Sequence, residues 1–260
     1  MKKFIERLWR ERIASFDDCP LPGQLPVNEG ERVLVFAPHS DDEILGCGGT
    51  LALLRRKNCP VRVVVVTDGA GGDPHNYVAG DVVRVREQES RAALKLVGVE
   101  DVVFWSEPDG NFRGSAAFDR KVNAVMEEFR PTWLFLPSPL DYHRDHVAIS
   151  LAVLSCWQRR ARPGRAFFYE IWCPLPATWI VDIGEVIDLK KQAIGCYHLP
   201  LRYRDYSVPC LGLAAYRGLY LPAADVPRYA EAFVEAERKW RGISYHLLRL
   251  RASLEGLLGK

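Results

Sequence analysis

The first half of the chain alternates between short apolar runs and longer segments in which apolar residues recur at helical spacing. The apolar runs cover residues 33–37, 61–67, 101–105 and 132–137. Runs of this kind are typical of strands that are covered on both faces. Strands that alternate with helices usually lie parallel, so the pattern predicts an α/β fold: a Rossmann-like, mainly parallel sheet with helices on both faces.

The predicted helices between these runs start at residues that suit a helix N-terminus. They cover about 43–56, 81–96, 115–129 and 147–157. Asp81 and Ser115 can each cap a first turn with a side-chain oxygen. The carboxyl ends of parallel strands meet at one edge of a sheet, so the loops that follow the four strands are expected to border one site. The long loop of residues 68–81 is among them.

The second half is less regular. We predict strands near residues 167 and 179, a helix over 185–197, an edge strand over 214–220 and a helical end from about Arg228. Two amphipathic helices are expected near the termini, over 3–16 and over about 238–258. Arginines flank the apolar stripe of the second one, which leaves open burial within the monomer, contact with another subunit and contact with an anionic membrane surface. The whole chain, 1–260, is expected to form a single domain, in which residues 1–30 are an N-terminal helix and connector.

Composition narrows the class of protein. At 260 residues and 48% hydrophobic content the chain can bury one large core. Its 35 basic and 33 acidic side chains leave a net charge of +2, which gives no general attraction to nucleic acid. Its seven cysteines are scattered without a CxxC pair, which favours free thiols in a reducing compartment. With no apolar signal segment and no transmembrane run, we expect a cytoplasmic protein.

Candidate chemistry lies where the first and fourth of these strands end. His39 and Asp42 follow the first strand, and His146 follows the fourth. Two imidazoles and one carboxylate form the ligand set of a catalytic zinc site that keeps an open position for water. Asp41 stands beside this set as a carboxylate that can take a proton from the water.

Two further residues complete the predicted chemistry. His143, three residues before His146, can stabilise an oxyanion and pass a proton to a leaving amine. Asp145 is predicted to orient a histidine or to form a charge pair with it, as carboxylates behind metal ligands do. Together these residues predict hydrolysis of an amide by an activated water.

The motifs PHSDDE at 38–43 and HRDH at 143–146 resemble those of the LmbE-like, or PIG-L, family of zinc-dependent N-acetylglucosaminyl deacetylases. The resemblance implies a Rossmann-like fold, one Zn²⁺ per chain and removal of an N-acetyl group from an acetamido-sugar substrate. By motif position, His39, Asp42 and His146 match the zinc ligands, Asp41 the general base and His143 the acid or oxyanion partner. The same resemblance implies that Arg86 and Asp109 hold sugar hydroxyls.

Several alternatives stay open at this point. Arg86 could simply pair with Glu89, three residues later, and Asp109 could be an ordinary turn residue. The same ligand set is the facial triad of non-haem iron oxygenases. Asp41 favours hydrolysis over that chemistry, and retention of Asp41 and His143 disfavours an inactive binding protein. A membrane-surface contact and a homo-oligomer are both left open.

Overall fold

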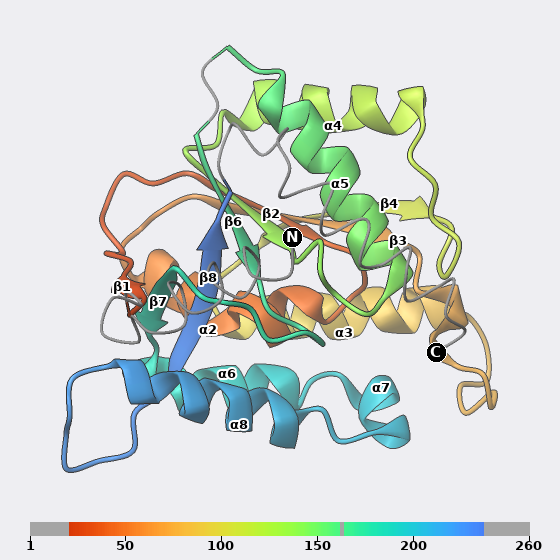
Figure 1. The fold of residues 1–260 in the computed structure, drawn as a ribbon. Helices are drawn as coiled ribbons and strands as arrows, with labels where there is room; N and C mark the ends of the chain where they lie inside the picture. The colour runs from red at the N-terminus through yellow and green to blue at the C-terminus, as the bar shows by residue number, and fades with distance from the viewer. Residues whose placement is uncertain (1–20, 162–163, 237–260) are drawn as a thin grey trace, which may run out of the picture.

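The structure is a computed structural model that describes residues 21–161 and 164–236. The helices predicted over 3–16 and 238–258 lie outside these residues. Within the described part of the chain, an eight-stranded sheet separates two layers of helices (Figure 1). The sheet order is β1-β7-β8-β6-β5-β2-β3-β4. The bounds of the strands are β1 Gly23–Gln24, β2 Val33–Ala37, β3 Val61–Thr67, β4 Asp101–Glu107, β5 Trp133–Pro137, β6 Arg165–Tyr169, β7 Trp179–Asp182 and β8 Ala230–Glu235.

The sheet is mainly parallel, as the sequence predicts. All neighbouring strands in it run parallel except β8, which pairs antiparallel with both β6 and β7. Every residue of β2 and β5 is buried, because helices cover both faces of the sheet there. This burial is why both strands appear in the sequence as uninterrupted apolar runs.

The helices form two layers (Figure 1). Their bounds are α2 Asp42–Arg56, α3 Val82–Leu96, α4 Ala116–Phe129, α5 Arg144–Gln158, α6 Ile187–Ile194, α7 His198–Tyr203 and α8 Ser207–Arg217, with short 3-10 turns at Ala70–Gly72, Gly184–Val186 and Gly218–Tyr220. Helices α4 and α5 cover one face of the sheet, and α2 and α3 lie on the other side, where α6 packs on α2 and α3 and lies beside α8. The predicted caps are confirmed, since Asp81 Oδ1 accepts from Arg84 N at 3.1 Å and Ser115 Oγ accepts from Phe118 N at 3.1 Å.

Two glycines let α2 lie close to the sheet and to the chain after β7. A Cβ atom at Gly46 would lie 2.2 Å from Cδ2 of Tyr169 in β6, and one at Gly49 would lie 2.8 Å from a side-chain carbon of Ile183. Both distances are far below carbon contact. The hydroxyl of Tyr169 donates in turn to the Phe36 carbonyl in β2, at 2.8 Å.

Two predictions in the second half are wrong. Residues 214–220 are not an edge strand but the end of α8 and the following 3-10 turn. The predicted helix from about Arg228 is wrong as far as Glu235, because Ala230–Glu235 forms β8. Its remainder, from residue 237, lies outside the described residues. The sequence of β8, AEAFVE, is rich in good helix formers, but pairing with β6 and β7 outweighs that local preference. The same strand lets the sheet continue beyond β6 to β7 and β1.

The predicted start of α5 shifts by three residues, from 147 to Arg144. Its N-cap is His143, whose Nδ1 accepts from Asp145 N at 3.2 Å. As a result, Asp145 and His146 lie in the first turn of α5. Since β2 and β5 are parallel neighbours, this turn faces the first turn of α2 across one edge of the sheet.

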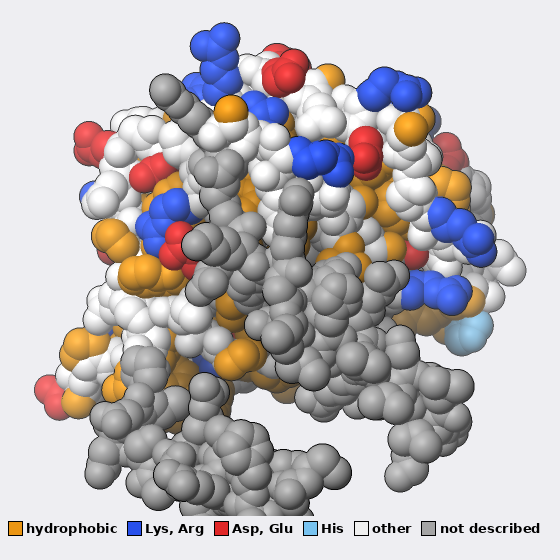
Figure 2. All heavy atoms as spheres, turned by 45° about the horizontal axis from the view of Figure 1, so that its top comes forward, with side chains coloured by type: hydrophobic (Ala, Val, Ile, Leu, Met, Phe, Trp, Pro, Cys, Tyr) orange, Lys and Arg blue, Asp and Glu red, His pale blue; other side chains and the backbone are white. Residues whose placement is uncertain are grey.

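None of the described helices is long and apolar enough to span a membrane. On the face drawn in Figure 2, lysine and arginine side chains are interspersed with acidic and apolar ones. This mixture accords with the net charge of only +2.

Candidate metal and active site

Three side-chain atoms converge where β2 and β5 end. His39 Nδ1, Asp42 Oδ2 and His146 Nε2 each lie 3.2 Å from the other two. In a tetrahedral zinc site with bonds near 2.0 Å, two ligand atoms would be about 3.3 Å apart. The triangle therefore has the size that three zinc ligands require, with the fourth position open.

Local backbone contacts hold this triangle. The Pro38 carbonyl, at the end of β2, accepts from Thr67 N at 3.0 Å and from Thr67 Oγ1 at 2.8 Å. His39 N donates to Asp42 Oδ2 at 2.9 Å, so the turn fixes both predicted ligands at once. His146 comes from the first turn of α5 and is 1% exposed.

The second nitrogen of each imidazole faces a carboxylate. His39 Nε2 lies 3.1 Å from Asp109 Oδ1 and 3.6 Å from Asp145 Oδ2. His146 Nδ1 lies 3.2 Å from Asp141 Oδ1, close enough for a hydrogen bond although the two groups are not aligned for one. Carboxylates in this position orient metal-binding histidines and select the tautomer that leaves the other nitrogen free to bind.

The electrostatics of the site suit a cation. Burial lowers the pKa of His39, but contacts with Asp109, Asp145 and Asp42 outweigh it and raise that pKa well above its usual value. Burial also lowers the pKa of His146, but the charge of Asp42 and the contact with Asp141 outweigh it and raise that pKa to about 9. The pKa of Asp42 falls, since the two imidazoles overcome its desolvation. Four carboxylates around two imidazoles leave an excess of negative charge, which a divalent ion would neutralise.

Asp41 stands next to the triangle with a different partner. Its Oδ2 accepts from Arg86 Nη2 at 3.0 Å, and both side chains are buried. Burial raises the pKa of Asp41, although the positive charge of Arg86 opposes the rise. Asp41 thus lines the same pocket as the triangle but is paired with Arg86.

Arg86 comes from α3 and contacts more than its helical neighbour. Its Nη1 lies 3.7 Å from Glu89 Oε2. The ion pair with Glu89 that the sequence left open is therefore present, but at a distance too long for a hydrogen bond. The Nε and Nη1 atoms of Arg86 are buried and have no hydrogen-bond partner among the described residues. These two donors lie on a side chain that lines the pocket over the triangle.

His143 completes the group of three histidines. Its ring centroid lies 4.7 Å from those of His39 and His146. Burial and the positive charge of these two neighbours lower the pKa of His143. Because its Nδ1 accepts from Asp145 N, the neutral ring carries its proton on Nε2, which is therefore a donor.

A pocket of about 480 Å³, called here the site pocket, opens over these residues. The loop 68–81 borders it through Gly69, Gly71, Gly72 and Pro74, as expected from the sequence. Asp109 also lines it, with Oδ2 accepting from Gly71 N at 2.9 Å. Trp172, Pro200, Tyr203 and Tyr206 form the wall supplied by the second half of the chain.

All eight residues predicted from the sequence therefore lie at one site. Asp145 contacts a histidine as expected, namely His39, and also accepts from Gly110 N at 2.7 Å and Phe112 N at 3.1 Å. The carboxylate behind His146 is Asp141, which the sequence analysis did not assign. Its place two residues before His143 in SPLDYHRDH was the only available signal.

Glu43 is a second residue at the site to which the sequence pattern assigns no role. It is fully buried and accepts from Tyr197 Oη at 2.8 Å and from Ser90 Oγ at 2.9 Å, and Asp41 N donates to it at 3.2 Å. Burial raises its pKa to about 7. It ties the first turn of α2 to α3 and to the start of α7, which no spacing along the chain could indicate.

Comparison with known proteins shows that this chain is similar to sugar deacetylases. The model of the PIG-L family, described as GlcNAc-PI de-N-acetylase, matches residues 34–157, which include all eight predicted site residues. A diacetylchitobiose deacetylase of Thermococcus kodakarensis is 27% identical over 191 residues, which cover 65% of this chain and 70% of that protein.

Solved structures share the fold. The N,N'-diacetylchitobiose deacetylase of Pyrococcus horikoshii superposes with a TM-score of 0.75 at 20% identity, covering 94% of this chain and 95% of that one. The 4-carboxy-2-hydroxymuconate hydratase of Pseudomonas putida does so with a TM-score of 0.68 at 22% identity, covering 80% of this chain and 96% of that one. The fold is therefore common to proteins with different reactions, so the reaction must be argued from the site.

Proposed function

Because this chain belongs to the PIG-L (LmbE-like) family, we propose that it is a metal-dependent deacetylase that hydrolyses the acetamide of an N-acetylglucosamine-type sugar. The observation that carries the proposal is the triangle of His39 Nδ1, Asp42 Oδ2 and His146 Nε2 with edges of 3.2 Å. Carboxylates behind both imidazoles support the same conclusion. We propose Zn²⁺ as the ion, because two nitrogens and one oxygen in a tetrahedral arrangement are typical of catalytic zinc.

Such an ion would lower the pKa of a bound water to about 7 and polarise the carbonyl oxygen of the acetamide. Asp41 would take the proton from the water as its oxygen forms a bond to the carbonyl carbon. Arg86 holds Oδ2 of Asp41, which fixes the carboxylate and leaves Oδ1 for the proton.

His143 would act on the other side of the reacting carbon. Its Nε2 proton is available as a hydrogen-bond donor to the developing oxyanion, because Nδ1 is engaged by Asp145 N. Cleavage of the carbon–nitrogen bond then needs a proton on the leaving amine. Asp41 would return the proton that it took from the water, and His143 would act as the acid only in its protonated form. The products are acetate and the free amino sugar.

The sugar is proposed to lie in the site pocket. The volume of this pocket, about 480 Å³, is within the range of small-molecule sites. Arg86 and Asp109, which both line this pocket, would hold sugar hydroxyls, with Asp109 as an acceptor. We also propose that the whole chain, 1–260, forms one domain around this site.

The first test is a panel of N-acetylated sugars, including N-acetylglucosamine and N,N'-diacetylchitobiose, assayed for released acetate. The chain is expected to release acetate without oxygen, to lose activity after chelation and to regain it with Zn²⁺. Oxygen-dependent product formation would favour an iron oxygenase with the same ligand set. Absence of acetate release from every member of the panel, with metal bound, would contradict the proposal.

A further inference from the structure

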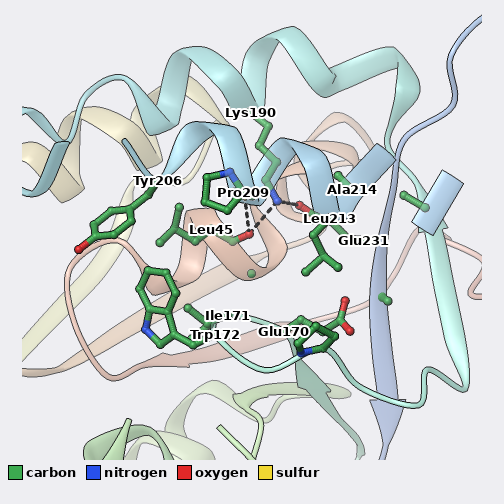
Figure 3. Close-up of a pocket in the computed structure, with 15 residues that line it drawn as sticks. Leu45, Glu170, Ile171, Trp172, Lys190, Tyr206, Pro209, Leu213, Ala214 and Glu231 are labelled. Carbon is green, nitrogen blue, oxygen red and sulfur yellow. Dashed lines mark hydrogen bonds and ion pairs between the residues drawn. The ribbon is translucent and has the colours of Figure 1, made fainter. Parts of the chain in front are cut away.

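A second cavity lies next to the site pocket and has no role in the reaction proposed above (Figure 3). Its volume is about 220 Å³, which exceeds the 150 Å³ or so of an apolar protein cavity known to bind benzene. Its walls come from α2, α6, α8 and β8 and from the chain after β6. Leu45, Ile171, Pro209 and Leu213 are among the side chains that face it. We call it the apolar cavity.

The charged groups that line the apolar cavity already have partners. Lys190 Nζ donates to Glu231 Oε1 at 2.6 Å and to the Leu45 carbonyl at 2.8 Å. Glu170 accepts from Leu175 N at 2.6 Å and from Arg217. These groups are already hydrogen-bonded and so are not free to bind a polar ligand. An alkyl group, in contrast, would be stabilised in the cavity because its apolar surface is removed from water.

The apolar cavity adjoins the site pocket through two aromatic residues. Trp172 and Tyr206 line both spaces, and their rings meet edge to face with centroids 5.1 Å apart (Figure 3). Trp172 is also tied to the metal site, since its backbone N donates to Asp141 Oδ2 at 3.1 Å. The two aromatic side chains thus lie at the border that the two spaces share.

The apolar cavity is also close to the position of the reacting carbonyl. Leu45 and Gly46, which line it, follow the predicted ligand Asp42 by three and four residues on the same helix. They therefore lie about one helical turn, roughly 5 Å, beyond that ligand on the same side of α2. Arg86 and Asp109, proposed to hold the sugar, line only the site pocket.

We propose that the apolar cavity binds the alkyl chain of an N-acyl group longer than acetyl, so that the substrate is a sugar whose amine carries a medium-length acyl chain. This inference rests on the function proposed above and names its substrate more closely. The carbonyl carbon must lie against the ligand triangle, so its alkyl substituent is the part of the substrate nearest the cavity. The reaction is unchanged: water adds to the carbonyl carbon, the carbon–nitrogen bond breaks, and a carboxylate and the free amine leave.

The test is a series of N-acylglucosamines with acyl chains of two to twelve carbons, assayed for released amine. We expect kcat/KM to rise by up to about fourfold for each added methylene, since each buried CH₂ contributes about 0.8 kcal/mol. The rise should stop near six to eight carbons, which is about the content that a cavity of this size holds. A parallel series of N-acetylglucosaminides with alkyl chains on the anomeric oxygen should show no such rise.

Variants of α8 link the effect to the apolar cavity. Leu213→Trp fills it and should bring the ratio of kcat/KM for hexanoyl over acetyl substrate back to near one. Leu213→Ala enlarges it and should move the preferred chain two to three carbons longer. The matched control is Val208→Trp on the same helix, 68% exposed and outside the cavity, which should leave the whole series unchanged.

Each negative result has its own meaning. Hydrolysis of the acetyl substrate without any gain from longer chains would overturn the acyl-chain proposal and leave the deacetylase intact. A gain that follows the anomeric alkyl chain instead would also overturn it. A gain that persists in Leu213→Trp would show that the chain lies elsewhere. Failure on every substrate, acetyl included, would count against the proposed function itself.

Discussion

Asp41 and Asp42 are adjacent in the sequence but have different partners in the fold. Asp42 faces two imidazoles and has a lowered pKa, whereas Asp41 pairs with Arg86 and has a pKa raised by burial. One is held as a carboxylate for a cation, and the other is placed where it can accept a proton. This difference at one helix start underlies the two roles proposed for them.

Replacing His146 by alanine removes one corner of the ligand triangle. His146→Ala should therefore lose the bound ion and, with it, activity. Metal analysis of the purified variant checks this, with His75→Ala as control, since His75 is an exposed histidine that lies outside the triangle. Full metal content in His146→Ala together with normal turnover would refute the ligand assignment.

Asp41→Asn separates the base from the ligands. The amide keeps the shape of the side chain and its contact with Arg86, but it cannot take a proton from water. Turnover should fall by about 10²- to 10⁴-fold while the metal content stays that of the wild type. Single-turnover and metal measurements on the same sample test this. Near-normal turnover with metal retained would rule out Asp41 as the base.

Asp141 is the carboxylate behind His146, and it also accepts from His143 N at 2.9 Å and from Trp172 N at 3.1 Å. Asp141→Asn should weaken metal affinity or activity about 10- to 100-fold, as loss of such a carboxylate does elsewhere. Competition with a chelating dye measures the affinity. Asp188→Asn, at an exposed position in α6, is the control. An unchanged affinity and turnover would show that Asp141 has no part in orienting the ligand.

At the scale of elements, α2 is a helix in two parts. Its backbone departs from helical angles at Cys47, with φ of −142° and ψ of 15°. The break frees backbone N–H groups of the second part, and Glu231 of β8 accepts from Gly49 N at 2.8 Å and from Thr50 N at 2.7 Å. A carboxylate from a distant strand thus caps a helix start in the middle of α2.

The other side of the break is capped by a lysine. Lys190 of α6 donates to the Leu45 carbonyl at 2.8 Å and to Glu231 at 2.6 Å, and it is 1% exposed. The pair therefore joins both parts of α2 to α6 and β8. Because Asp41 and Asp42 lie at the start of the first part, this connection also helps to fix the position of the site residues.

Lys190→Met keeps most of the buried volume but leaves Glu231 charged and without its cation. Removing one partner of a buried ion pair costs about 3–5 kcal/mol, so the free energy of unfolding should fall by that amount. Denaturant unfolding measures it. Lys191→Met, one residue along and exposed, should change the stability by less than about 0.5 kcal/mol. Equal effects of the two substitutions would exclude the connecting role.

At the scale of the whole molecule, metal binding should stabilise the fold. The proposed ligands come from two separate segments, 39–42 and 146, which approach only in the folded chain. An ion that binds the folded state alone stabilises it by about 2.7 kcal/mol at 100 times its Kd. Zn²⁺ should therefore raise Tm in a concentration-dependent way, and a chelator should lower it. His146→Ala should show no such response, and a Tm independent of metal in the wild type would argue against the site.

Local patterns in the sequence were sufficient to predict many of the strands, helix starts and site residues of this protein. The apolar runs predicted β2 to β5, and Asp81 and Ser115 marked two helix starts, because burial and capping leave signals within a few residues. The site was predictable for the same reason. Its main residues lie in two short motifs, 38–43 and 143–146, after two strands whose loops the pattern placed at one edge of the sheet. The structure adds that these strands, β2 and β5, are direct neighbours.

Only the tertiary structure decided the rest, because pairing between distant segments leaves no local signal. β8 has the composition of a helix and becomes a strand only by pairing with β6 and β7. The roles of Asp141 and Glu43 depend on which side chains fold against them, and the same holds for the pair of Lys190 and Glu231. The apolar cavity exists only where five separate parts of the chain meet, so no stretch of sequence could have indicated it.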